Sequence, residues 1–117
     1  MNRISISIEK LNEYKEKVTV KTGQWFDLDK ATTYNEHTKW NGKNQISKAT
    51  GVEHYHECLY VTKGGLFILN SWSNWQGSPD TYIVISKKEA GEWFAKNEYN
   101  DEEIPEILLD VINTLEV

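Results

Sequence analysis

Residues 52–73 read VEHYHECLYVTKGGLFILNSWS, two β-prone runs that are separated by Lys63-Gly64-Gly65. Paired glycines supply the positive φ angles that a tight β-hairpin requires. A third β-prone run, TYIVIS at residues 81–86, follows a Gly-Ser-Pro-Asp junction that is typical of a turn. We therefore predict an antiparallel three-stranded meander over about residues 52–62, 66–73 and 81–86.

Helices are expected before and after this meander. Ser7 can cap an N-terminal helix over about residues 8–17, where apolar side chains recur at near-helical spacing. After the meander, the capping-box sequence SKKE predicts a helix over about residues 87–97. Apolar residues then repeat at intervals of three and four over residues 104–115, which predicts a last helix. The predicted class is α+β, an antiparallel sheet with an N-terminal helix and two C-terminal helices packed on it.

The chain is expected to form a single domain spanning residues 1–117, because its length is typical of one hydrophobic core. Five Trp, six Tyr and three Phe residues predict an aromatic-rich core. The segment 30–51 has almost no aliphatic residue, so we expect a long irregular loop there with a turn at Asn41-Gly42. A loop of that length in a compact domain is uncommon unless it has a function or contains short helices of its own.

The charge balance favours some partners over others. The chain carries 13 Lys and Arg against 18 Asp and Glu, a formal charge of -5, which weighs against binding a phosphate backbone. Arg3 is the only arginine, although guanidinium contacts dominate nucleic-acid recognition. An acidic chain suits a basic protein partner instead. With one cysteine, Cys58, and no apolar run of membrane-spanning length, we expect a cytoplasmic location and no membrane association.

The sequence EHYHEC contains a candidate metal site. On a strand His54, His56 and Cys58 face one side, and two histidines at i and i+2 can ligate one zinc or iron ion. Cys58 lies about 13 Å from His54 on a straight strand, so a third ligand would come from elsewhere. Histidines on the solvent side of a half-exposed sheet are the alternative, and no nucleophile motif surrounds Cys58, so no catalytic residue is assigned. The candidate third ligands are Asp27, Asp29, His37, Glu53 and Glu57.

The stretch NSWSNWQGSPD at residues 70–80 carries two tryptophans three residues apart. Trp72 continues the strand alternation, whereas Trp75 falls where the chain begins to turn. We predict that one of the two packs between sheet and helix against Trp93, and that the other lies over the 77–79 turn at the rim. The exposed member would begin a binding surface. The candidate binding residues are Trp40, Trp72, Trp75 and Tyr82.

Residues 59–99 resemble a pattern in small bacterial proteins of unassigned function. Its parts are Leu-Tyr-x-Thr, Trp-Ser-x-Trp-x-Gly and Glu-Ala-x-x-Trp, and the upstream WFD and WNGKNQIS belong to it, so the resemblance spans about residues 22–99. It implies a shared fold with repeated aromatic anchors and suggests a mobile-element or toxin-antitoxin context. It implies no activity.

Three hypotheses about function follow from the sequence. The leading one is a non-enzymatic interaction module without a cofactor that binds a protein partner or small ligand through an aromatic surface. Its specific form is an acidic inhibitor or antitoxin-like protein. The first alternative is a metal-dependent enzyme that uses His54 and His56 with zinc or iron. The second is a structural domain that forms a homo-oligomer by pairing a sheet edge.

Overall fold

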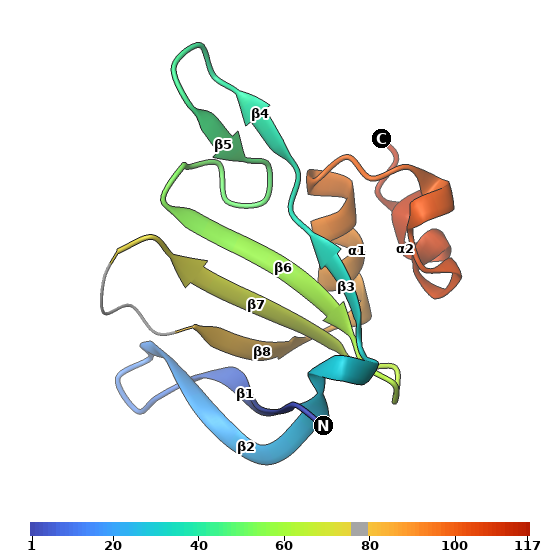
Figure 1. Ribbon diagram of the computed structural model, residues 1–117. Helices are drawn as coiled ribbons and strands as arrows, with labels where there is room; N and C mark the ends of the chain where they lie inside the picture. The colour runs from blue at the N-terminus through green and yellow to red at the C-terminus, as the bar shows by residue number, and fades with distance from the viewer. Residues whose placement is uncertain (76–79) are drawn as a thin grey trace.

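The computed structural model describes residues 1–75 and 80–117, and within them the chain forms eight β-strands and two α-helices (Figure 1). The strands are β1 (Arg3–Leu11), β2 (Lys17–Asp27), β3 (Thr32–Asn35), β4 (Thr38–Trp40), β5 (Gln45–Ser47), β6 (Tyr55–Val61), β7 (Phe67–Ser73) and β8 (Thr81–Ile85). The helices are α1 (Lys87–Lys96) and α2 (Leu109–Thr114). Short 3₁₀ turns lie at Leu28–Lys30, Asp101–Glu103 and Glu106–Leu108.

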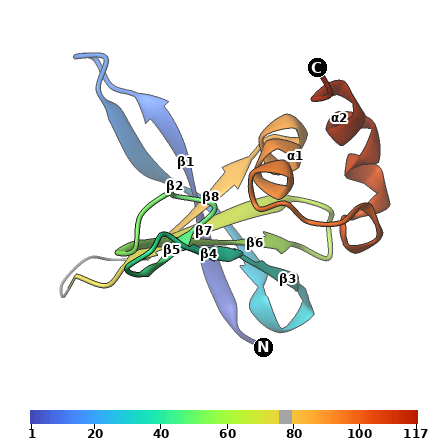
Figure 2. The same cartoon turned by 90° about the horizontal axis from the view of Figure 1, so that it is seen from above.

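Six strands form one mixed sheet in the order β2-β1-β8-β7-β6-β3, and β4 pairs with β5 in a separate hairpin. Neighbouring strands of the large sheet are antiparallel except β1 and β8, which run parallel and pair at Ser7 and Ile83. Both helices lie on one side of this sheet, and the β1–β2 hairpin crosses the other strands at a steep angle (Figure 2). We call the opposite side the helix-free face.

The strands β6, β7 and β8 form an antiparallel meander at the centre of the sheet. The turn between β6 and β7 is tight, because the backbone amide of Thr62 donates to the carbonyl of Leu66 at 2.9 Å. Gly65 adopts a φ of +88°, the left-handed region that glycine enters without a steric penalty. The Gly-Gly pair therefore sets the register of the two strands.

The predicted N-terminal helix is wrong, because β1 and β2 occupy this part of the chain. The isoleucines of RISISI alternate with polar residues, which is the period of a strand, and Ile6 is buried with 1% of its surface exposed. The side chains that suggested a helical stripe, Leu11 and Tyr14, are exposed by 61% and 76%. The apolar stripe therefore follows the strand and not the helical period.

The predicted fold class is corrected as a consequence. The protein is a mixed α/β fold with a parallel strand pair, and its two short helices both lie at the C-terminal end of the described residues. The α+β prediction assumed that every strand pairs with a neighbour in the sequence. The pairing of β1 with β8 joins segments more than seventy residues apart, which no local pattern reveals.

Of the two predicted C-terminal helices, the first begins where it was predicted and the second is shorter than predicted. The helix α1 begins as predicted, since Ser86 Oγ accepts from the backbone amide of Glu89 at 3.1 Å and the Glu89 carboxylate accepts from the Ser86 amide at 3.2 Å. The last predicted helix is shorter than expected, because 3₁₀ turns occupy residues 101–103 and 106–108 and α2 begins only at Leu109. Pro105 explains this, since a proline forces the residue before it out of the helical region.

The segment 30–51, expected to be an irregular loop, contains β3, β4 and β5. Tyr34 on β3 packs edge-on against Phe94 of α1, with ring centroids 4.9 Å apart. The predicted turn is present at Asn41, whose Oδ1 accepts from the backbone amides of Lys43 and Asn44 at 2.9 and 2.8 Å. The segment is thus anchored to the sheet and to α1.

The sheet has a hydrophobic core on each side. Under α1 and α2 the buried side chains include Leu59, Phe67 and Phe94. On the helix-free face Phe26 of β2 packs against Tyr60 and other apolar residues, with the two ring centroids 5.7 Å apart. Within the described residues no helix has the length and apolarity that crossing a bilayer requires.

Candidate binding site at the histidine-tryptophan edge

The first residues of β6 and the last residues of β7 bring two histidines and two tryptophans together. His56 pairs directly with Trp72, and the two rings stack with centroids 5.7 Å apart and planes at 26°. His54 lies 5.0 Å from Trp75 between ring centroids, and the carbonyl of His54 accepts from the Asn74 amide at 2.9 Å. We call these four residues the histidine-tryptophan edge.

A carboxylate fixes the edge from the side. Glu36, in the link between β3 and β4, lies 2.7 Å from His56 Nδ1 through Oε2, and only 11% of its side chain is exposed. Its Oε1 accepts from Ser47 Oγ at 2.9 Å and from the backbone amide of Glu57 at 2.7 Å. One side chain therefore ties β6 to the β3–β4 link and to the end of β5.

The histidine pair lacks the surroundings that a metal site requires. Within residues 1–75 and 80–117 no three His, Cys, Asp or Glu side chains are grouped closely enough to hold an ion. His54 Nε2 lies 3.1 Å from Glu53 Oε1, and His37 stacks on Tyr99 with centroids 4.2 Å apart. Asp27 Oδ1 accepts a hydrogen bond from the backbone amide of Asn2. The zinc or iron alternative stays a prediction.

Cys58 is a buried thiol with 3% of its surface exposed. Burial raises its pKa, and the nearby carboxylates of Glu36, Asp80 and Glu57 act in the same direction. Its Sγ lies 3.5 Å from Asn70 Oδ1. A thiol held neutral in this way is a poor nucleophile.

Two of the predicted binding residues are exposed, and the other two pack against neighbouring side chains. Trp75 at the end of β7 is 58% exposed, and Trp40 at the end of β4 is 62% exposed. Tyr82 packs in the helix-free core, 6.3 Å from Phe26 between ring centroids. The prediction that one tryptophan of the pair packs against Trp93 is wrong, because Trp72 stacks on His56 while Trp93 lies on the helix side. The predicted contact with the 77–79 turn lies outside the described residues.

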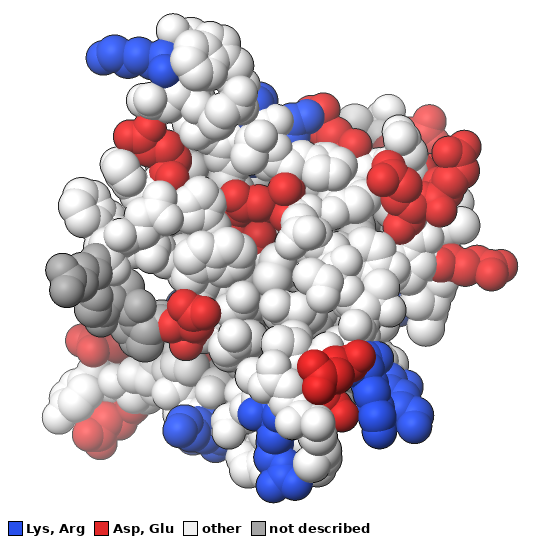
Figure 3. All heavy atoms as spheres, in the orientation of Figure 1, with Lys and Arg blue, Asp and Glu red and all other residues white. Residues whose placement is uncertain are grey.

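Charged side chains of both signs lie on the helix-free face. Figure 3, in the orientation of Figure 1, looks onto that face. It shows Asp and Glu side chains in the middle and at the left, right and lower borders, and Lys and Arg side chains toward the upper and lower borders.

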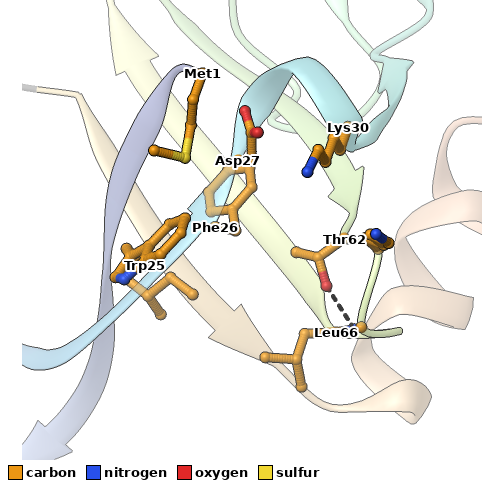
Figure 4. Close-up of a pocket in the computed structure, with 10 residues that line it drawn as sticks. Met1, Trp25, Phe26, Asp27, Lys30, Thr62 and Leu66 are labelled. Carbon is orange, nitrogen blue, oxygen red and sulfur yellow. Dashed lines mark hydrogen bonds between the residues drawn. The ribbon is translucent and has the colours of Figure 1, made fainter.

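A pocket with a volume of about 300 Å³ lies at the end of the sheet that is farther from the histidine-tryptophan edge. Trp25, Phe26 and Met1 form its apolar wall, with Asp27 and Lys30 beside them (Figure 4). The Arg3 guanidinium covers Trp25 at 4.3 Å from the ring centroid. Asp27 Oδ1 accepts from the backbone amides of Asn2 and Asp29, both at 3.1 Å. The Asp27 carboxylate therefore stabilises the local backbone.

A pocket of about 240 Å³ lies on the helix side of the sheet, next to the histidine-tryptophan edge. Sequence reasoning missed this pocket and the role of Glu36. A signal for the pocket was present, because Ser71 and Ser73 continue the strand face on which Leu69 is apolar. No comparable signal marked Glu36, which acts through contacts with residues distant in sequence. The pocket residues are Thr50, Tyr55, His56, Glu57, Ser71, Trp72, Ser73 and Thr81.

Comparison with protein-family models, with curated proteins and with solved structures finds no match for this chain.

Proposed function

We propose that this protein is a non-enzymatic interaction module that binds a basic protein partner. The observation that carries the proposal is the exposure of two tryptophans, Trp75 and Trp40, by 58% and 62%. Tryptophan is enriched among the few interface residues that contribute most of a binding free energy. Leaving such side chains in water is costly unless a partner covers them.

The histidine-tryptophan edge is rigid before any partner arrives. His56 is held between the Trp72 ring and the Glu36 carboxylate, and Glu36 is itself held by Ser47 and by the Glu57 amide. A side chain that is already ordered loses little rotamer entropy on binding. This supports the edge as the fixed part of an interface.

The net negative charge supports a basic partner in particular. The chain has a formal charge of -5, and complementary charge raises association rates and rejects partners of the wrong sign. An acidic inhibitor or antitoxin-like protein is the specific form of this proposal. A free thiol at Cys58 is compatible with a reducing compartment, so we further propose a cytoplasmic location.

A site-specific photo-crosslinker tests the proposal. The amino acid p-benzoylphenylalanine would replace Trp75 or Trp40, and in a control it would replace Tyr14, an aromatic residue in the turn between β1 and β2 that is 76% exposed. Irradiation in the native cell should give one discrete adduct with a basic protein from positions 75 and 40 and none from position 14. The absence of an adduct at both test positions, or equal labelling at position 14, would overturn the proposal.

A further inference from the structure

The helix side of the sheet changes character along its strands. Under α1 the register places Leu59 beside Leu69 and Leu69 beside Ile83, an apolar row that the helix covers. The next row along the strands consists of Glu57, Ser71 and Thr81, and the row after that of Tyr55 and Ser73. Small hydroxyl side chains replace large apolar ones just where the sheet continues beyond the helix. Their small size leaves the pocket open.

We call this space the hydroxyl pocket, and its lining residues are Thr50, Tyr55, His56, Glu57, Ser71, Trp72, Ser73 and Thr81. The volume of about 240 Å³ is below the range of about 300–1,000 Å³ that pockets for drug-sized ligands occupy. A single side chain of a partner fits such a space better than a cofactor does. Five of the eight lining residues carry a hydroxyl, which can accept a hydrogen bond.

Glu57 provides the only formal charge in the hydroxyl pocket. Its Oε1 accepts from Trp93 Nε1 at 3.1 Å, and in the part of the chain that the structure describes its Oε2 has no hydrogen-bond partner. Burial raises the pKa of this carboxyl, against the opposing effects of Lys96 and of the Trp93 bond. Lys96 does not close the pocket, since its ammonium group donates to the carbonyl of Ala49 at 3.1 Å. A cation that reached Oε2 would therefore relieve a partly desolvated charge.

We propose that the hydroxyl pocket binds the ammonium group of a lysine side chain presented by the basic partner. An ammonium group has three donors, which can be shared between Glu57 Oε2 and two hydroxyl oxygens. A guanidinium fits less well, because its paired donors match a carboxylate with both oxygens free. The exposed Tyr55 ring, which borders the pocket, can cover the lysine methylenes or the cation itself. This inference rests on the proposed function and names the group of the partner that enters the protein.

Titration with a small amine tests the pocket without any partner. Nα-acetyl-lysine methylamide would be added to ¹⁵N-labelled protein, and the amide shifts of residues 55, 57, 71 and 81 would be followed. We expect saturable shifts in the millimolar range, about tenfold weaker or absent for the uncharged norleucine derivative. Glu57→Gln should abolish them. Its side-chain oxygen can still accept from Trp93, so the fold is retained, and Glu13→Gln in the exposed turn between β1 and β2 is the matched control that should leave them unchanged.

Each other outcome overturns the inference. Equal binding of the norleucine derivative would show that charge plays no part. The corresponding arginine derivative is titrated in the same way, and equal binding of it would refute the choice of an ammonium group. Unchanged binding to Glu57→Gln would place the site elsewhere. Because no partner protein takes part in this titration, it can fail while photo-crosslinking at Trp75 succeeds, and the reverse also holds.

Discussion

At the scale of single residues, Glu36 is the side chain on which the candidate site depends most. It joins three segments through contacts with Ser47 Oγ, the Glu57 amide and His56 Nδ1. Each of these groups would lose its partner if the carboxylate were removed, and an unsatisfied buried polar group costs about 1–3 kcal/mol. The carboxylate therefore matters to stability as well as to the orientation of His56.

We expect Glu36→Ala to lower the free energy of unfolding by about 2–4 kcal/mol, because several hydrogen bonds are lost at once. Urea denaturation followed by tryptophan fluorescence measures this change. Glu53→Ala is the control, since Glu53 pairs with His54 in a more exposed position and its loss should change stability by less than about 1 kcal/mol. Equal losses for the two variants would contradict the structural role of Glu36.

Glu57 should make stability depend on pH. Its folded-state pKa is raised by burial above the ordinary 4.5, so the folded protein keeps this proton to a higher pH than the unfolded chain does. Stability is then lost as the pH rises from the unfolded pKa through the folded one. We expect Glu57→Gln to be more stable than the natural protein near pH 7 and to match it near pH 4. Urea denaturation at both pH values tests this, and a difference that is independent of pH would contradict it.

At the scale of elements, α1 and α2 meet at Gly91. A methyl group added there would lie 2.5 Å from Val111 Cγ1 and 3.1 Å from its Cβ. Glycine inside a helix ordinarily costs about 0.5–1 kcal/mol relative to alanine. Here that cost is offset by the close approach of α2, which places Val111 directly against the α1 backbone.

We expect Gly91→Ala to destabilise the protein by about 1–3 kcal/mol despite the better helix propensity of alanine, because α2 must move away. Thermal unfolding measures the loss. The double variant Gly91→Ala/Val111→Ala should recover part of it, because the smaller side chain makes room and the two changes are coupled. A single variant more stable than the natural protein would show that α2 does not pack here as described.

Elements with local causes could be predicted, and elements with distant causes could not. The meander and the start of α1 follow from Lys63-Gly64-Gly65 and from the Ser86 capping box, whose contacts span only a few residues. In β1 a helical and a strand period compete in the sequence, and the strand pairs with β2 over most of its length and with β8, far along the chain, at Ser7. The partner of Trp72 could not be predicted for the same reason, because it is set by the pairing of two strands. Trp72 stacks on His56 of β6 and does not pack against Trp93 of α1.

At the scale of the whole molecule, charge and aromatic exposure coincide at one end. The β4–β5 hairpin, the beginning of β6 and the end of β7 carry Trp40, Tyr55 and Trp75, each more than half exposed. Acidic side chains of the helix-free face lie nearby, whereas Lys39 and Lys43 flank Trp40 on the β4–β5 hairpin, and the hydroxyl pocket opens on the other side of β6 and β7. A partner that grips this end of the sheet would meet aromatic contacts and carboxylates together.

Isothermal titration calorimetry of this protein with the partner that photo-crosslinking identifies tests the central claim most directly. Trp75→Ala should weaken binding by about 2 kcal/mol, or about thirtyfold, as expected for a central interface tryptophan. Binding of the natural protein should also weaken as salt is added, because the attraction between exposed charges is screened. Tyr14→Ala should bind within about twofold of the natural protein. If Trp75→Ala binds as tightly as Tyr14→Ala at every salt concentration, the histidine-tryptophan edge is not the binding surface.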